Sequence, residues 1–221
     1  PHPSPLEGPT RQRVRSGLAG TFRLLPALDR LVADQETKLV QLTEWQAAAL
    51  AGLYTNDRLV VSGPAGSGKT MLAVATAKHL AARGKKVLFL CFNRSLAEWL
   101  REILPDSAFP TVAVHTFNAL CADWCRRAGI PYCVPDSDPE RQEFFRSAAA
   151  EILCQASDRV TERYDAIVVD EAQDFEPEWW LPIELLNENA EDGSLFIFYD
   201  PKQNLFVNKK LSFPANAARF D

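Results

Sequence analysis

Apolar residues gather in short runs along the chain, with stretches of helical spacing between them. The runs lie at 58–62, 86–92, 111–115, 166–170 and 194–199. Nearly continuous apolar runs of this length are typical of strands that are buried on both faces of a sheet. Because helical segments connect them, neighbouring strands are expected to be parallel. The pattern predicts an α/β domain, a parallel sheet with helices on both faces.

The same pattern divides the chain. Residues 1–38 hold a segment rich in proline and arginine and then a short amphipathic helix, so they are expected to form a linker and a helix; the arginines either are solvated or contact a phosphate backbone. Residues 39–221 are expected to form the sheet domain. Within it, 121–165 is predicted to be a small helical insertion between two strands, with turn-rich residues at 129–140 and a helix at about 140–156.

Composition narrows the class of protein. The chain has 221 residues, 47% of them hydrophobic and 24% charged, which fits one large globular domain and excludes disordered and fibrous chains. The net charge is -5, so a nucleic-acid partner would need a local basic groove. No apolar run is long enough to span a membrane, and the five cysteines without a secretory leader predict a reducing, cytoplasmic location. The start at Pro1 suggests a fragment, or a chain joined to a further N-terminal domain.

The strongest chemical motif follows the first predicted strand and opens the next helix. It matches the P-loop (Walker A) pattern G-x4-G-K-[ST] and reads Gly63, Pro64, Ala65, Gly66, Ser67, Gly68, Lys69 and Thr70. Glycines let backbone N–H groups surround phosphates, and the helix N-terminus adds a positive partial charge. Lys69 is expected to hold the β- and γ-phosphates of ATP, and Thr70 to bind Mg²⁺. The alternative is a glycine-rich turn that only packs a strand on a helix.

Two acidic residues, Asp170 and Glu171, stand at the end of the strand run at 166–170. Asp170 is expected to hold Mg²⁺ with Thr70, as the Walker B acid does, and Glu171 to accept a proton from the attacking water. An acidic pair after a strand also occurs as a helix cap, so its meaning here depends on the P-loop.

From these acids onward, Asp170-Glu-Ala-Gln-Asp174 resembles the DExQD box of UvrD/Rep-like superfamily 1 DNA helicases. Other segments between about 39 and 206 follow the order of that family's motifs. Leu42-Thr-Glu-Trp-Gln46 resembles its Q-motif, which implies that Gln46 reads adenine; a helix that starts at Thr43 with Gln46 on its surface is compatible with this role. The resemblance implies a RecA-like ATP-binding domain, the first of two.

Two further segments resemble the motifs that face single-stranded DNA in this family. Phe92, Asn93 and Arg94 follow one strand run, and Thr116 and Phe117 follow another. The resemblance implies that an aromatic ring stacks a base while the polar side chains contact phosphates, which is binding without sequence preference. From the residues alone, Phe92 and Phe117 would both be interpreted as core residues, and for Phe117 this alternative stays open.

The segment 194–206 resembles motif III, in which Gln203 would sense the γ-phosphate. It departs from the family at Tyr199, where glycine is usual, and at Asn208, where a DNA-stacking tryptophan is common. No segment resembles the motifs of the second, C-terminal RecA-like domain, which supplies the arginine fingers. We therefore expect this chain alone to hydrolyse ATP slowly and not to unwind DNA.

The sequence thus predicts an ATP hydrolase, the motor domain of a single-stranded DNA helicase or translocase. Two alternatives stay open: a nucleotide-gated module that binds a protein partner, and, less well supported, a small-molecule kinase. Cys121, Cys125, Cys133 and Cys154 lack the C-x2-C spacing of zinc and iron–sulfur sites and are expected to be buried thiols rather than metal ligands. Trp179 and Trp180, after Pro177, are expected to pack in the core or against a subdomain.

Overall fold

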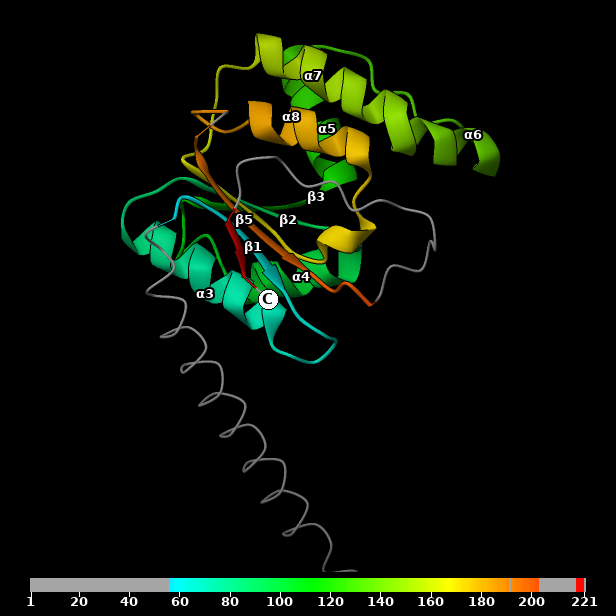
Figure 1. Cartoon of the computed structure of the whole chain (residues 1–221). Helices are drawn as coiled ribbons and strands as arrows, with labels where there is room; N and C mark the ends of the chain where they lie inside the picture. Colours follow the sequence, from blue (N-terminus) through cyan, green and yellow to red (C-terminus); the bar gives the residue numbers. More distant parts are fainter. Residues whose placement is uncertain (1–55, 191, 203–217, 221) are drawn as a thin grey trace, which may run out of the picture. The chain divides into compact units, whose positions relative to one another are not determined.

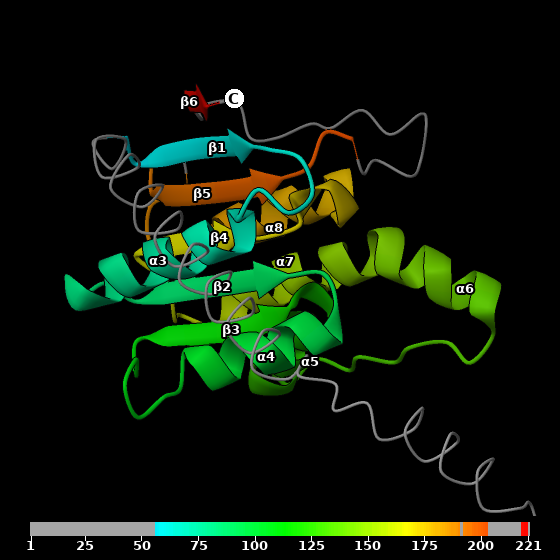
Figure 2. The ribbon, with the colours of Figure 1, turned by 90° about the horizontal axis from the view of Figure 1, so that it is seen from below.

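The described part of the chain is built on a twisted parallel sheet. The computed structural model describes residues 56–190, 192–202 and 218–220, which lie within the unit Trp45–Asp221. The strands follow the order β3-β2-β4-β5-β1-β6, and every neighbouring pair is parallel (Figure 2). Their bounds are β1 Arg58–Ser62, β2 Val87–Cys91, β3 Val112–Thr116, β4 Ala166–Val169, β5 Ser194–Tyr199 and β6 Ala218–Phe220.

Helices cover both faces of this sheet (Figure 1). Helices α3 and α4 lie on one face, and α5, α7 and α8 on the other. Their bounds are α3 Lys69–Ala82, α4 Arg94–Ile103, α5 Phe117–Ala128, α6 Asp138–Glu143, α7 Ala149–Arg159 and α8 Trp180–Leu185. A π-helix, Phe144–Ala148, joins α6 to α7, and two short 3-10 turns, Ala172–Asp174 and Pro177–Trp179, connect β4 to α8.

Successive side chains of the central strands enter two separate cores. In β2, Leu88 and Leu90 pack with the α5, α7 and α8 layer, whereas Val87 and Phe89 pack with α3 and α4. The other central strands alternate in the same way. Because adjacent side chains of a strand point to opposite faces, a strand between two helical layers must be apolar at every position. This requirement explains why the strand runs lack polar alternation.

The carboxyl ends of β1 to β5 all lie at one edge of the sheet, because these strands are parallel. The P-loop follows β1, and Asp170 follows β4. Phe92 follows β2, Phe117 follows β3, and Asp200 follows β5. We call this edge the carboxyl edge. In open α/β sheets, ligands bind outside this edge, so the topology brings residues from five distant parts of the sequence to one place.

The predicted fold class is confirmed, with two differences in its elements. The helix expected at 140–156 is interrupted by the π-helix, which divides it into α6 and α7. Strand β6, which pairs with β1, was not predicted. Its three residues are too few to stand out as an apolar run. Within the described ranges, no helix combines the length and the apolar character needed to cross a membrane.

Candidate functional site

The loop between β1 and α3 has the backbone that its glycines require. Gly66 and Gly68 adopt left-handed conformations, with φ of 75° and 85°, which residues with a side chain rarely adopt. A Cβ on Gly63 would lie 2.7 Å from the Ser67 hydroxyl. Gly68 is the N-cap of α3 and offers no side chain to its first turn. The helix therefore begins with backbone N–H groups and their positive partial charge facing the loop, an arrangement that binds phosphate.

Lys69 lies at the start of α3 with its ammonium group turned back onto the loop. Its Nζ donates hydrogen bonds to the carbonyl oxygens of Gly63 and Pro64, at 2.9 and 3.0 Å. The same Nζ lies 4.0 Å from Oδ2 of Asp200, and both side chains are buried. A buried ammonium needs partners of this kind, and a bound phosphate would supply stronger ones.

Asp170 brings an unpaired carboxylate to the same place. It is completely buried, and neither of its oxygens accepts a hydrogen bond of ordinary length within the described residues. Burial, and to a smaller extent the neighbouring Glu171 carboxylate, raise the pKa of Asp170 to about 6, although Thr70 and Lys69 oppose this shift. A carboxylate in such surroundings is stabilised by a cation. Oxygen ligands from Thr70 and Asp170 are of the type that Mg²⁺ prefers.

Glu171 has a strained backbone. Its φ is 53°, a left-handed value that no other non-glycine residue in the described ranges adopts. Such a conformation costs about 1–3 kcal/mol and persists only where the surroundings hold it. The Glu171 side chain is half buried, and its carboxylate accepts a hydrogen bond from Nε2 of Gln173.

Two buried polar residues near Glu171 were not among the predicted site residues. Gln173 also accepts, at Oε1, a 3.0 Å hydrogen bond from the backbone N–H of Asp200. Asp200 is 1% exposed, and its Oδ1 accepts a 2.8 Å hydrogen bond from the Lys202 N–H. The only sequence signals were their places in the segments that resemble the DExQD box and motif III. Those segments gave no reason to connect the two residues to each other.

Gln46 and Gln203, predicted to read adenine and to sense the γ-phosphate, lie outside the described residues. The same applies to Asn208. The structure therefore brings together the P-loop, Asp170 and Glu171, and it places neither glutamine.

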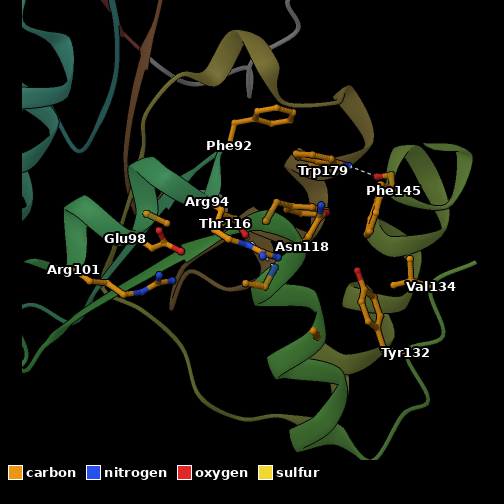
Figure 3. Close-up of a pocket in the computed structure, with 14 residues that line it drawn as sticks. Phe92, Arg94, Glu98, Arg101, Thr116, Asn118, Tyr132, Val134, Phe145 and Trp179 are labelled. Atoms are coloured by element: carbon orange, nitrogen blue, oxygen red, sulfur yellow. Dashed lines mark hydrogen bonds between the residues drawn. The ribbon is translucent and has the colours of Figure 1, made fainter. Parts of the chain in front are cut away.

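A groove of about 720 Å³ lies at the same carboxyl edge, lined by residues along α4 and by the N-terminal half of α5 (Figure 3). Phe92 forms part of its wall, and its side chain is 47% exposed. Arg94 and Arg101 line the groove together with one acid, Glu98. An acidic chain thus has a groove where basic side chains outnumber acidic ones, the local feature that a nucleic-acid partner requires.

Asn93 and Thr116, predicted to contact phosphates, act here as helix caps. Asn93 Oδ1 accepts a 2.7 Å hydrogen bond from the Leu96 N–H at the start of α4. Thr116 Oγ1 accepts one of 3.3 Å from the Ala119 N–H at the start of α5. The phosphate role was implied by the resemblance to the helicase motifs, and a cap uses the same residue types as a phosphate contact. Both helix N-termini lie beside the groove, so backbone N–H groups are additional candidates for phosphate contacts.

The expectation that the Phe117 ring faces DNA does not fit the structure. Phe117 is 1% exposed, and its ring lies parallel to that of Trp179 with 4.0 Å between the centroids. A base has no free ring face to stack on, so Phe117 belongs to the core, the alternative that the residues alone allowed. Strand β3 ends at Thr116, and α5 begins at Phe117 with this ring directed inward.

The Trp179 ring packs against the ring of the exposed Phe92. The two rings lie 6.3 Å apart and 18° from parallel (Figure 3). The Trp179 indole N–H donates a 2.8 Å hydrogen bond to the carbonyl of Phe145 in the π-helix. A π-helix shifts the backbone hydrogen-bond pattern, and here one of its carbonyl groups holds the tryptophan. The prediction that Trp179 and Trp180 are buried is confirmed.

The four cysteines between residues 121 and 154 differ in their burial. Within the described ranges, no cluster of three or more histidine, cysteine or acidic residues could hold a metal ion. Burial raises the pKa of the Cys121 thiol well above its usual range, and it raises the pKa values of Cys125 and Cys154 as well. Protonated, buried thiols pack as small apolar groups, which describes Cys121 and Cys125; Cys154 is only partly buried, and the expectation of burial is wrong for Cys133, which is exposed.

Comparison with known proteins agrees with the P-loop geometry. A family model described as an AAA domain matches residues 46–209, which is well over half of the chain. The match includes the P-loop, the acids after β4 and the strands on either side of them. A search of curated proteins found no match. The chain therefore belongs to the AAA-domain family of P-loop proteins.

Proposed function

We propose that this chain is the ATP-binding and ATP-hydrolysing motor domain of a UvrD/Rep-like superfamily 1 DNA helicase or translocase that acts on single-stranded DNA. One observation carries the proposal: the P-loop with its acids and the groove with the exposed Phe92 lie at the same edge of one sheet. A motor must couple the binding and hydrolysis of the nucleotide to the binding of DNA. Side-by-side sites on one rigid sheet allow this coupling.

The nucleotide is bound mainly by the loop backbone and by the side chains of Lys69, Thr70 and Asp170. Lys69 leaves the carbonyls of Gly63 and Pro64 when the β- and γ-phosphates arrive, because the phosphates offer it full negative charges. Thr70 and Asp170 would hold Mg²⁺, which would neutralise charge on the phosphates.

Glu171 activates the attacking water as the general base. It follows Asp170 directly, so the acid that holds the cation and the acid that takes the proton end the same strand. In this proposal Gln46 recognises adenine and Gln203 senses the γ-phosphate.

Single-stranded DNA binds in the groove over α4 and α5. A base stacks on Phe92, and Arg94 pairs with a phosphate. Asn93 and Thr116 keep the N-termini of α4 and α5 in place, where backbone N–H groups meet further phosphates. Because neither stacking nor phosphate contact depends on the base, the binding is expected to tolerate any sequence.

The test measures the anisotropy of a labelled single-stranded oligonucleotide titrated with the chain, at low and at physiological salt. Each titration is made with and without Mg²⁺ and a nonhydrolysable ATP analogue. We expect the affinity to change with nucleotide. The change Phe92→Ala should weaken binding roughly five- to hundredfold, because stacking contributes about 1–3 kcal/mol per base. Arg94→Ala should make the affinity less sensitive to salt.

Two matched controls separate these effects from general loss of a surface side chain. Leu181→Ala removes an apolar side chain that is 63% exposed on α8, and Arg83→Ala removes an exposed arginine at the end of α3. Neither residue lines the groove. Equal affinities of Phe92→Ala and Leu181→Ala would contradict the DNA site and favour a P-loop module that binds a protein partner. RNA as competitor tests the preference for DNA.

A further inference from the structure

The side chain of Gln173 connects the ends of two neighbouring strands. It is 3% exposed and lies in the 3-10 turn that follows Glu171. Its amide nitrogen donates to the Glu171 carboxylate, and its amide oxygen accepts from the Asp200 N–H at the end of β5. The NH₂ group and the oxygen of this buried amide are therefore both hydrogen-bonded, one to Glu171, shortly after β4, and the other to Asp200, directly after β5.

The contact with Glu171 restrains a carboxylate that a strained backbone alone would hold poorly. Glu171 has a φ of 53° and is only half buried. A half-buried side chain has several staggered rotamers, which direct its carboxylate differently. A donor fixed in the core selects one of them, which is how a catalytic group is held by its neighbours.

The contact with Asp200 reaches the P-loop. The Asp200 carboxylate lies 4.0 Å from the Lys69 ammonium group, and that ammonium donates to two carbonyls of the loop. A shift of the β5 end would therefore move both the Asp200 carboxylate beside Lys69 and the Asp200 N–H that donates to Gln173. The three groups form one connected network.

We infer that Gln173 is a positioning residue for ATP hydrolysis. It holds the Glu171 carboxylate toward the attacking water, and through its hydrogen bond from the Asp200 N–H it makes the position of that carboxylate depend on the end of β5. The inference rests on the proposed function, because it needs Glu171 to act as the base. It assigns Gln173 no contact with the nucleotide. Loss of Gln173 should thus lower the rate of hydrolysis without a matching loss of nucleotide affinity.

The experiment compares Gln173→Met, which has similar size but no amide, with Gln142→Met on the exposed surface of α6. Single-turnover hydrolysis of ATP is measured with single-stranded DNA present, and the affinity for Mg²⁺ and a nonhydrolysable ATP analogue is measured in parallel. We expect Gln173→Met to slow hydrolysis about ten- to hundredfold, the effect of a small misplacement of a reacting group. Its affinity for the analogue should stay within about threefold of wild type, and Gln142→Met should match wild type in both.

A second variant gives a signature that a purely structural role would not produce. In Gln173→Glu, a carboxylate at neutral pH repels Glu171, whereas its protonated form donates a hydrogen bond as the amide does. The rate of Gln173→Glu relative to wild type should therefore rise as the pH falls from about 8 to 6. Dividing by the wild-type rate cancels the titration of groups that do not contact position 173, so the ratio reports the pair formed by Glu171 and the new carboxyl group.

Several results would overturn the inference. One is hydrolysis by Gln173→Met within twofold of wild type; another is a parallel loss of hydrolysis and analogue affinity, which would indicate general damage to the site. A pH-independent ratio for Gln173→Glu would show that no donor to Glu171 is needed. Glu171→Gln distinguishes failure of the proposed function: if it hydrolyses ATP as fast as wild type, Glu171 is not the base and Gln173 has no base to position.

Discussion

At the scale of single residues, Asp170 combines complete burial with a carboxylate that no neighbour in the described part of the chain neutralises fully. Without a cation, this arrangement lowers the stability of the folded chain, because a charged group is kept from water. Functional sites often hold such groups ready for a ligand.

The cost of this burial should appear as a pH dependence of stability. The pKa of Asp170 is about 6 in the folded chain against an ordinary value of 3.8. Between these values the folded state binds more protons than the unfolded state, so this group makes the free energy of unfolding fall as the pH rises through that window. The effect at pH 7 is on the order of 2–3 kcal/mol.

The variant Asp170→Asn lacks this titration, so its free energy of unfolding minus that of wild type should increase from about pH 4 to pH 7 and then level off. Urea unfolding of both proteins at several pH values, without Mg²⁺ or nucleotide, measures the difference. Effects of the new amide on packing are the same at every pH and do not change the trend. A difference that is constant across this range would contradict the buried, unpaired carboxylate.

Some of these residues could be predicted because their chemistry is encoded locally. The P-loop and the acids after β4 are contiguous motifs, and their spacing alone indicates phosphate and cation binding. Gln173 and Asp200 are different, because their contact joins residues 27 positions apart in the sequence. The pattern of either segment does not reveal that contact. It depends on β4 and β5 being neighbours in the sheet, which is a property of the topology.

At the scale of elements, the first residues of α4 and α5 serve both helix capping and the proposed binding of phosphates. Asn93 and Thr116 cap these helices, and the groove lies beside both N-termini. A cap fixes the direction of the helix start, and that direction decides where the free backbone N–H groups point. Stability and phosphate binding can be separated here by changing charge without changing the cap.

Asn93→Asp keeps a capping oxygen but adds a negative charge, and aspartate caps as well as asparagine. We expect the free energy of unfolding to stay within about 0.5 kcal/mol of wild type while single-stranded DNA affinity falls several-fold. Asn93→Ser, a neutral cap, should preserve both. Urea unfolding and oligonucleotide anisotropy measure the two quantities. If Asn93→Asp binds DNA as tightly as wild type, the start of α4 does not face a phosphate.

The elements themselves were predictable where burial imposes a simple pattern. The strands β1 and β5 agree with their apolar runs at both ends, because both faces of each strand are covered. The π-helix was not predictable, since 140–156 has ordinary helical composition. The hydrogen bond from Trp179 to Phe145 accompanies it, and this contact comes from a residue 34 positions away.

At the scale of the whole described domain, the carboxyl ends and the amino ends of the strands hold residues of different kinds. The P-loop, Asp170, Asp200 and Phe92 all follow the carboxyl ends of strands. The amino ends hold a structural ion pair instead: Arg58, at the start of β1, pairs with the Glu184 carboxylate of α8 and donates a 3.2 Å hydrogen bond to the Gly193 carbonyl. Its side chain is 6% exposed. Nothing at that edge is required by the proposed function.

This separation predicts different effects on nucleotide affinity when either of two buried cations is removed: Arg58 at the start of β1, or Lys69 after the P-loop that follows β1. Arg58→Met leaves Glu184 without its partner, and breaking a buried pair costs on the order of 3 kcal/mol of stability. Nucleotide affinity, measured well below the melting temperature with a fluorescent nonhydrolysable ATP analogue and Mg²⁺, should stay within about twofold of wild type, because the carboxyl edge is unchanged. Lys69→Ala should weaken the affinity for the analogue by at least about tenfold, since a charge-assisted contact to the phosphates is lost; its melting temperature should fall as well, because the buried Asp200 carboxylate loses its cation. Lys69→Ala with wild-type affinity would contradict the phosphate site, and a large loss of affinity in folded Arg58→Met would show that the two edges of the sheet are coupled.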